Sequence, residues 1–267
     1  MTKSLSLILR GLIRGIAMLL PRWKRATFLA RLYESLQPFE EVTIDGHTLK
    51  IYVPDRTSIY WVKDAPLSEP MTNRWIASLS PTDVLLDVGA NVGFFSMLAA
   101  SQGASKVYAI EPNPFSFDAL CRNIIRNDLQ HIVMPINMAI SENSGCVEFA
   151  LSGTSVGSIN NHISTGAQSG KLHLDMMAVS LDFLHAQDMI CDVTHIKIDI
   201  DGLELEVIKG SQQLLSPAKL KSVLIEDDGN DANRKERDAL MHSLGYTISS
   251  DFGSQDQYTI FERAPSA

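Results

Sequence analysis

Residues 84–95 read Val-Leu-Leu-Asp-Val-Gly-Ala-Asn-Val-Gly-Phe-Phe. The first five of these, 84–88, are mostly apolar and predict a short buried strand. Two glycines in the turn, Gly89 and Gly93, let the backbone bend sharply and approach a ligand closely. The aromatic pair that follows fits a helix packed on a sheet. The segment therefore predicts an α/β fold with a ligand at the carboxyl end of this strand.

The rest of the chain continues this alternation of strand and helix patterns. Further strands are expected at 106–110, 132–136, 196–200, 222–226, 246–249 and 257–261, with helices at 94–100, 115–127, 203–215 and 232–244. Such an order is typical of parallel sheets covered by helices on both faces. We predict a doubly wound, Rossmann-like sheet that is mostly parallel, with an antiparallel strand at its C-terminal end.

Composition sets limits on the class of protein. The 267 residues, 45% of them hydrophobic, can bury the core of one α/β domain. Beyond residue 33 the chain holds 16 bases against 31 acids, which argues against broad nucleic-acid binding because phosphates need cations. The three cysteines, Cys121, Cys146 and Cys191, are far apart and form no CxxC, so we expect reduced thiols in a cytoplasmic protein.

The N-terminal segment 1–33 is basic and has no acidic residue. Its apolar residues recur at helical spacing, and its seven bases are Lys3, Arg10, Arg14, Arg22, Lys24, Arg25 and Arg31. Arginines interrupt the apolar run before Pro21, so the segment is a poor membrane span, and it lacks a clear signal-peptide cleavage site. We expect an amphipathic helix that lies on the inner face of a membrane or packs on protein, either the body or a second subunit. The oligomeric state is left open.

Three regions follow from these patterns: a basic helical extension at 1–36, a hairpin and cap at 37–80, and a catalytic domain at 81–267. The hairpin is expected from strand patterns on either side of Asp45-Gly46. Within the catalytic domain, residues 153–170 are rich in Gly, Ser, Thr and Asn and predict a mobile loop. That loop is either a substrate lid or a surface insertion.

The turn after the first strand carries a second signal, an acidic residue on the next strand. The turn has the pattern DxGxNxG, which differs from the GxGxxG of dinucleotide sites. Glu111 ends the second strand, 22 positions after Gly89, where a carboxylate can accept hydrogen bonds from both ribose hydroxyls. The combination favours an adenosine-containing ligand without a pyrophosphate.

Two blocks of the chain resemble the FkbM family of S-adenosylmethionine-dependent methyltransferases. The first is VLLDVGANVGFFSMLAA, followed by VYAIEPNP. The second, Ile196 to Gly210, is similar to that family's KxDxEGxExxxLxG segment, and residues 137–145 are similar to a third element. One departure is Asp201, where the family usually has Glu. The resemblance covers roughly residues 80–230.

The resemblance implies a Rossmann-like methyltransferase with S-adenosylmethionine as its cofactor. By position, the turn would surround the amino-acid end and the sulfur of the cofactor, Glu111 would hold the ribose, and the segment after the third strand would lie along the adenine. The residues concerned are Asp87, Gly89, Ala90, Asn91, Gly93, Glu111, Asn137, Met138 and Ala139. Plain core packing is an equal explanation for Met138.

Acidic residues at the ends of the later strands are the candidate catalytic groups. Methyl transfer needs an aligned nucleophile and, for a hydroxyl, a base. The candidates are Asp199, Glu226, Asp201 and Glu204. Crowded carboxylates raise one another's pKa, which suits a base, and the same group could bind a divalent cation, although no metal ligands are assigned. His162, in the 153–170 loop, is a further candidate base.

The leading hypothesis is O-methylation of a hydroxyl on a sugar, glycan or glycolipid, with the substrate class implied by the resemblance alone. N-methylation of an amine or amide is the alternative within the same class of enzyme. A nicotinamide-dependent oxidoreductase and a membrane-tethered binding module without activity are alternatives from other classes. No nucleic-acid partner is expected.

Overall fold

The computed structural model describes residues 2–36, 38–164, 172–227, 229–255 and 257–263. The chain divides into two compact units, Met1–Phe39 and Glu40–Ala267. The larger unit contains the predicted sheet together with the hairpin and cap.

The larger unit is built on a central sheet. Its strands are β3 (Val84–Val88), β4 (Lys106–Ile110), β5 (Val133–Ile136), β10 (His195–Ile198), β11 (Ser222–Glu226), β12 (Tyr246–Ile248), β13 (Ser254–Gln255) and β14 (Tyr258–Arg263). They follow the order β12-β14-β11-β10-β3-β4-β5, with β13 paired to β14. From β5 to β11 the pairing is parallel, and β14 runs antiparallel to β11. The doubly wound prediction with an antiparallel C-terminal strand is confirmed.

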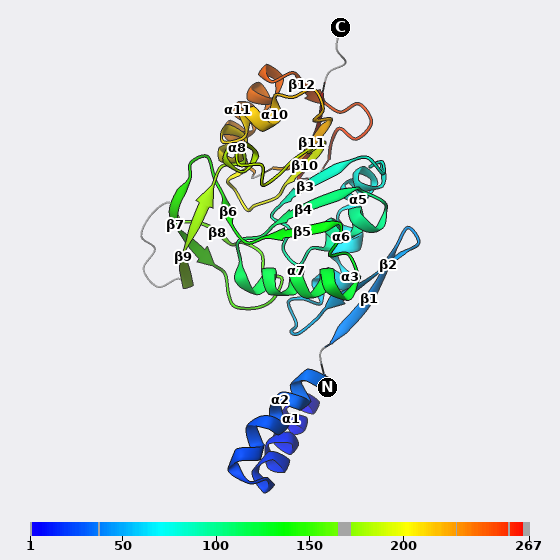
Figure 1. Cartoon of the computed structure of the whole chain (residues 1–267), viewed down its shortest axis with the longest axis vertical. Helices are drawn as coiled ribbons and strands as arrows, with labels where there is room; N and C mark the ends of the chain where they lie inside the picture. The colour runs from blue at the N-terminus through cyan, green and yellow to red at the C-terminus, as the bar shows by residue number, and fades with distance from the viewer. Residues whose placement is uncertain (1, 37, 165–171, 228, 256, 264–267) are drawn as a thin grey trace. The chain divides into compact units, whose positions relative to one another are not determined.

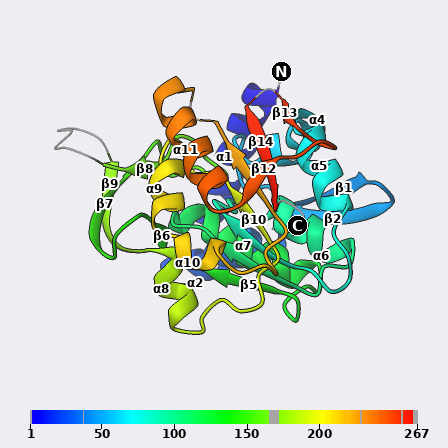
Figure 2. The ribbon, with the colours of Figure 1, turned by 90° about the horizontal axis from the view of Figure 1, so that it is seen from above.

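Helices cover both faces of this sheet (Figures 1 and 2). On one face lie α5 (Pro70–Ala77), α6 (Phe94–Ser101) and α7 (Pro114–Arg126), and on the other α8 (Leu181–Ala186), α9 (Glu204–Lys209), α10 (Gln212–Leu215) and α11 (Asp231–Ser243). The prediction of a single helix at 203–215 is wrong, because α9 ends at Lys209 and α10 begins at Gln212. The chain breaks there because the carboxylate of Asp182 accepts hydrogen bonds from the backbone N–H groups of Gln213 and Leu214, which gives α10 an N-terminus of its own.

The burial of β3 explains why its sequence is apolar almost throughout. All five of its residues are buried, as expected for a central parallel strand with helices on both faces. Phe94 and Phe95 at the start of α6 are also buried and pack edge to face. The turn between strand and helix is thus anchored by packing at both ends.

The hairpin and cap precede the sheet in the chain. The predicted hairpin is confirmed as β1 (Phe39–Ile44) and β2 (His47–Tyr52), and the short helices α3 (Tyr60–Lys63) and α4 (Ala65–Ser68) follow it. Asn123 on α7 accepts a hydrogen bond from the N–H of Tyr52 at 2.7 Å and donates to the carbonyl of Val92 at 2.9 Å. One buried amide therefore ties the hairpin to the glycine turn.

A second sheet interrupts the alternation of strand and helix. It consists of β6 (Ala139–Ile140), β7 (Gly145–Leu151), β8 (His162–Ile163) and β9 (Leu172–Val179), in the order β6-β9-β7-β8. The segment expected to be a mobile loop, 153–170, contains β8, which pairs with β7. Residues 165–170 of that prediction lie outside the described residues.

The smaller unit is a pair of helices rather than the single helix predicted over 1–33. The helices are α1 (Thr2–Leu19) and α2 (Arg22–Ser35), and Pro21 separates them because proline lacks the N–H that a continuous helix needs. Arg25 donates hydrogen bonds to the carbonyls of Met18 and Leu20, both at 3.0 Å, which satisfies the end of α1. Among the described residues no helix is long and apolar enough to cross a membrane.

Gly89 stands where the turn meets the neighbouring strand. Its φ is +90°, and a Cβ built there would lie 1.8 Å from the backbone carbonyl oxygen of Asp199. Its N–H donates to the carbonyl of Ile110 at 3.0 Å. Since the obstacle is backbone of the sheet, no side chain can be accommodated without moving β10.

We expect Gly89→Ala to lower the free energy of unfolding by more than about 3 kcal/mol, since the clash adds to backbone strain of about 1–3 kcal/mol. Gly103→Ala is the matched control: its φ is +109°, but no atom lies within 4 Å of the point where its Cβ would stand, so only the strain remains. Urea unfolding of both variants measures the difference. If both variants lost the same free energy of unfolding, the clash with the Asp199 carbonyl would not be the cause of the Gly89→Ala effect.

Candidate active site

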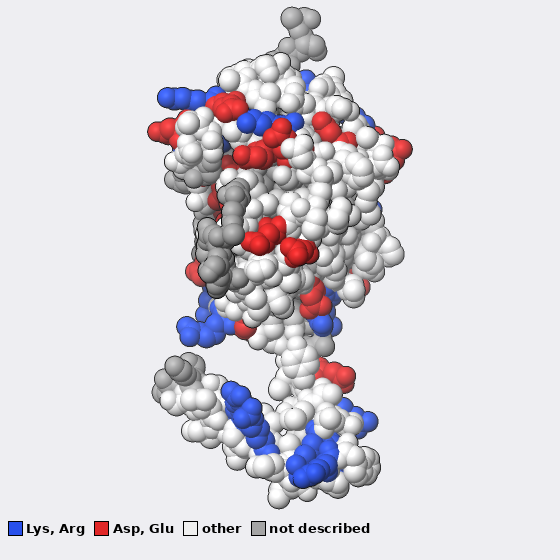
Figure 3. Space-filling view, turned by 90° about the vertical axis from the view of Figure 1, so that its left-hand side faces the viewer, with Lys and Arg blue, Asp and Glu red and all other residues white. Residues whose placement is uncertain are grey.

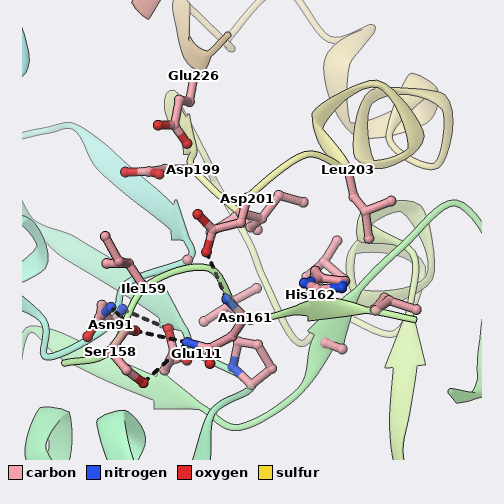
Figure 4. A pocket seen from close by; sticks show the side chains of 18 of the residues that line it. Asn91, Glu111, Ser158, Ile159, Asn161, His162, Asp199, Asp201, Leu203 and Glu226 are labelled. Atoms are coloured by element: carbon pink, nitrogen blue, oxygen red, sulfur yellow. Dashed lines mark hydrogen bonds between the residues drawn. The ribbon is translucent and has the colours of Figure 1, made fainter. Parts of the chain in front are cut away.

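A cavity opens at the carboxyl ends of β3, β4, β10 and β11 (Figure 4). Its volume is about 990 Å³ with its solvent-filled mouth included. The cofactor candidates on its wall are Gly89, Asn91, Glu111, Met138 and Ala139, and the catalytic candidates are Asp199, Asp201 and Glu226. The parallel order of the strands brings these distant segments together, because their carboxyl ends share one edge of the sheet.

The glycine turn holds its shape through left-handed backbone at three positions. Gly89, Asn91 and Gly93 have φ of +90°, +50° and +82°. Asp87 lies beneath the turn, fully buried, and accepts a hydrogen bond from the Ser96 hydroxyl at 2.5 Å. Asp87, Ala90 and Gly93 do not line the cavity and contribute to the shape of the turn.

Two buried oxygens of this turn have no hydrogen-bond partner among the described residues. They are Oδ1 of Asp87 and Oδ1 of Asn91. A buried acceptor left unpaired costs about 1–3 kcal/mol, so such atoms mark a site where a ligand supplies the donor. Asn91 is on the cavity wall, and the ammonium of an amino-acid group is a donor of the kind it lacks.

Glu111 is fixed at the end of β4 by the backbone. Its Oε2 accepts from the N–H of Asn91 at 2.8 Å, and its Oε1 accepts from the N–H of Asn113 at 2.7 Å. Burial raises the pKa of this carboxyl to about 7, against the lowering effect of those two hydrogen bonds. Each oxygen keeps a second lone pair, which suits the two hydroxyls of a ribose.

The segment after β5 lies partly on the cavity wall. Met138 and Ala139 line the cavity, whereas Asn137 points back to the chain. The Asn137 amide donates to the carbonyls of Glu111, at 2.7 Å, and Pro112, at 3.2 Å. Asn137 therefore positions the segment instead of lining the cavity.

Two acids on the cavity wall, Asp199 and Glu226, are backed by a buried lysine. Lys197, on β10, is 1% exposed and donates to Asp199 at 2.5 Å. Although burial alone would raise the pKa of Asp199, Lys197 and a hydrogen bond from Glu226 hold it below its ordinary value. Burial and the Asp199 charge raise the pKa of Glu226 to about 10. These opposite pKa shifts favour an ionised Asp199 and a protonated Glu226, whose side chain points toward Asp199 (Figure 4).

The two remaining catalytic candidates occupy different positions. Asp201 lines the cavity and accepts from the N–H of Asn161 at 3.1 Å, and its pKa is raised by burial and by Asp199. Glu204, in the first turn of α9, does not line it. Its Oε1 accepts from the N–H groups of Gly202, at 3.0 Å, and Ile200, at 3.4 Å. Glu204 therefore braces the loop that carries Asp201.

Several wall residues were missing from the sequence-based prediction. Glu69, just before α5, is buried and joins the cavity wall, as does Tyr258 on β14. Tyr258 lies on the antiparallel strand that was predicted at the C-terminal end, where it pairs with Glu226. The sequence predicted the strand but not the register of this pairing, which is what places Tyr258 at the cavity. Glu69 belongs to the cap, where no pattern marked it.

The segment 152–163 covers one side of the cavity. Its Ser158 accepts hydrogen bonds from Asn91 and Asn113, both at 3.2 Å, and the indole N–H of Trp61 donates to the carbonyl of Gly157 at 3.2 Å. His162 lines the cavity, unlike His173, His185 and His195. The described part of this segment, which was expected to be either a substrate lid or a surface insertion, thus lies beside the site and is hydrogen-bonded to both the turn and the cap.

A metal site receives no support from the geometry. Within the described ranges, no group of three or more His, Cys, Asp or Glu side chains is placed to hold a metal ion. Lys197 already occupies the space beside Asp199, where a cation would otherwise be attracted.

Comparison with known proteins identifies a family match over residues 87–248, to the methyltransferase FkbM domain. The hexuronic acid methyltransferase AglP of Haloferax volcanii is 26% identical over 172 residues, which are 64% of this chain and 68% of that protein. The 31-O-demethyl-FK506 methyltransferase FkbM of Streptomyces tacrolimicus is 26% identical over 197 residues, covering 64% of this chain and 75% of the other.

A similar solved structure is that of methyltransferase FkbM from Methylobacillus flagellatus. It is 17% identical, with a TM-score of 0.48, and the match covers 69% of this chain. The chain corresponds to only 44% of that protein's length.

The site predicts a pH-dependent affinity for S-adenosylhomocysteine. Ionised Glu111 would accept hydrogen bonds from both ribose hydroxyls, whereas the protonated acid would have lost acceptor capacity. Because the pKa of Glu111 is about 7, the dissociation constant should fall as pH rises through that value. Calorimetric titration on either side of pH 7 measures it. In Glu111→Gln the pH dependence should disappear; a slope that persists in this variant would assign it to another group.

Proposed function

The chain belongs to the FkbM family of S-adenosylmethionine-dependent methyltransferases, and we propose that it methylates a hydroxyl group of a sugar, glycan or glycolipid. The observation that carries the hydroxyl assignment is the pair Asp199 and Glu226 on the cavity wall, with Lys197 bound to Asp199 behind it. The relative named for its action on hexuronic acid supports a sugar-type acceptor. Family membership leaves no ground for the oxidoreductase or the inactive binding module.

The cofactor would be held by the turn and its neighbours. Gly89 allows close approach of the backbone, Asn91 offers an unpaired acceptor, and Glu111 faces the ribose. Met138 and Ala139 would flank the adenine. When bound, S-adenosylmethionine supplies a methyl group on a sulfonium, whose carbon–sulfur electron pair stays on sulfur as the methyl leaves.

Asp199 is the group proposed to receive the proton of the acceptor. A hydroxyl becomes strongly acidic as its oxygen bonds to the methyl carbon, so a carboxylate with a lowered pKa is basic enough to take the proton at that stage. The same carboxylate is too weak a base to deprotonate an alkylammonium, whose pKa lies near that of lysine, about 10. This mismatch favours a hydroxyl over an amine acceptor.

Glu226 and Lys197 would keep Asp199 ionised and oriented. Lys197 neutralises the carboxylate from the buried side, and protonated Glu226 donates to it from the cavity side. Both contacts restrict the carboxylate to one orientation, which aligns the acceptor oxygen. Asp201 and Glu69 are proposed to contact the acceptor, since both lie on the same wall.

Asp199→Asn should lower kcat by at least about 100-fold, because a neutral amide cannot accept the proton. Glu226→Gln should lose far less, because the amide still donates a hydrogen bond as the protonated acid does. Asp192→Asn, in an exposed ion pair with Lys219, should leave kcat unchanged. Turnover of labelled S-adenosylmethionine provides the readout, and urea unfolding checks that each variant is folded. Full turnover by a folded Asp199→Asn protein would remove Asp199 as the proton acceptor.

We also propose that the helix pair binds the anionic inner surface of a membrane, in keeping with a cytoplasmic enzyme acting on lipid-linked acceptors. At about 100° per residue, one side of α1 carries six exposed apolar side chains, and Arg10 and Arg14 fall on the opposite side. The six are Leu5, Ile8, Leu9, Leu12, Ile16 and Leu19. Lys and Arg side chains are visible along this unit in Figure 3. An apolar face beside a surplus of bases is the pattern of interfacial helices.

The full chain should sediment with vesicles of phosphatidylglycerol and much less with vesicles of phosphatidylcholine. Changing Leu5, Leu12 and Ile16 together to Gln should weaken binding by at least about tenfold, since each side chain buried in lipid contributes about 1.5–3 kcal/mol. The matched control changes three exposed apolar residues of the larger unit, Leu67, Ile125 and Met177, to Gln. Equal sedimentation of the two triple variants would contradict the proposal.

A further inference from the structure

We propose that the acceptor group entering this cavity is an uncharged, hydroxyl-bearing sugar ring, and that anionic sugars such as uronic acids are excluded, in contrast to the relative that is named for its action on hexuronic acid. The inference deepens the proposed function and depends on it. It follows from the charge distribution on the wall that remains after the cofactor residues are set aside.

Among the described residues, the wall beyond the glycine turn carries acidic side chains and no free cation. Four carboxyl groups reach it from three parts of the chain: Glu69 from the cap, Asp199 and Asp201 from the loop after β10, and Glu226 from β11. Among the described residues that line the cavity there is no lysine or arginine, and His162 is the basic side chain.

The lysine behind this wall, Lys197, is already paired with an acid. Lys197 is 1% exposed, contacts Asp199 at 2.5 Å and lies 5.1 Å from the centre of the Phe95 ring. Its pKa is raised well above the ordinary value despite burial, because Asp199, Asp87 and Glu69 surround it. Lys197 therefore balances charge behind the wall and offers no ammonium to a ligand in front of it.

The pKa values of the neighbouring acids are raised chiefly by burial, with the Asp199 charge as a further cause. Burial first, and then the Asp199 charge, raise the pKa of Asp201. Burial also raises the pKa of Glu69, with Asp199 contributing and Lys197 opposing. A further carboxylate brought into the cavity would lose its hydration and meet these groups without a cationic partner, an arrangement that binding sites avoid.

A neutral sugar matches the same wall. Its hydroxyls donate hydrogen bonds to Asp199 and Asp201, and its hydroxyl oxygens accept one from protonated Glu226. Tyr60 and Trp61 line the mouth from the cap, and aromatic rings pack well against the apolar faces of ligands. The hydrogen-bond donors and acceptors of the sugar and of the cavity wall are thereby paired, and no further charge enters the cavity.

The test compares sugars that differ only in one charge. With the intact chain saturated by S-adenosylhomocysteine, saturation-transfer NMR would measure binding of methyl glucoside against methyl glucuronide, and of methyl galactoside against methyl galacturonide. The neutral member of each pair should bind at least about tenfold more tightly, and added salt should reduce this preference.

Charge-neutralising variants locate the source of the preference. Asp201→Asn and Glu69→Gln keep side-chain volume and should narrow the ratio between neutral and anionic sugars. Asp192→Asn, an exposed acid outside the cavity, is the control and should leave the ratio unchanged.

The binding results distinguish a failure of the acceptor inference from a failure of the proposed function. If the chain binds S-adenosylhomocysteine but binds the uronides as well as or better than the neutral glycosides, or binds no neutral glycoside, the acceptor inference is overturned while methyl transfer stands. Preferred binding of glucosamine would overturn it in the same way. If S-adenosylhomocysteine itself does not bind, the proposed function fails first.

Discussion

The parallel pairing of β3 with β10 is the constraint on which the rest of the site depends. Asp87 stands beside Lys197 in this register and Val88 beside Ile198, although more than 100 residues separate the strands in the chain. The pairing ends with the N–H of Asp199 donating to the carbonyl of Val88 at 3.0 Å. Past that point the two chains diverge, one into the glycine turn and the other into the acidic loop, and the cavity opens between them.

The same pairing explains why a lysine can be buried in the middle of a sheet. An isolated ammonium would lose far more hydration energy than the core could return, so it needs compensating charge. Asp87 on the neighbouring strand and Asp199 two residues ahead provide that charge, and Phe95 on α6 adds a ring face. The arrangement links the cofactor turn to the catalytic acids through one cation. Neither half of the site is independent of the other.

Sequence patterns predicted the elements of the fold more completely than the contacts between them. The apolar run of β3 and the glycine turn were recognisable because strand burial and left-handed backbone restrict residue type. Glu111 and Asp199 were found because they end strands of that sheet. Glu69 was missed because its place on the wall depends on how the cap folds back, and Lys197 was passed over because its spacing does not reveal its burial. Glu204 was included with the catalytic acids because a carboxylate that braces a loop and one that faces a ligand look alike in the sequence.

The segment 152–163 is held less firmly than the central sheet. It is joined to the turn and the cap by individual hydrogen bonds, among them those of Ser158 and Gly157. Each such bond contributes about 1 kcal/mol net, and β8 at the end of the segment pairs with β7 over two residues. The free energy needed to open this side of the cavity is therefore expected to be smaller than the free energy needed to unfold the sheet that carries the reacting groups.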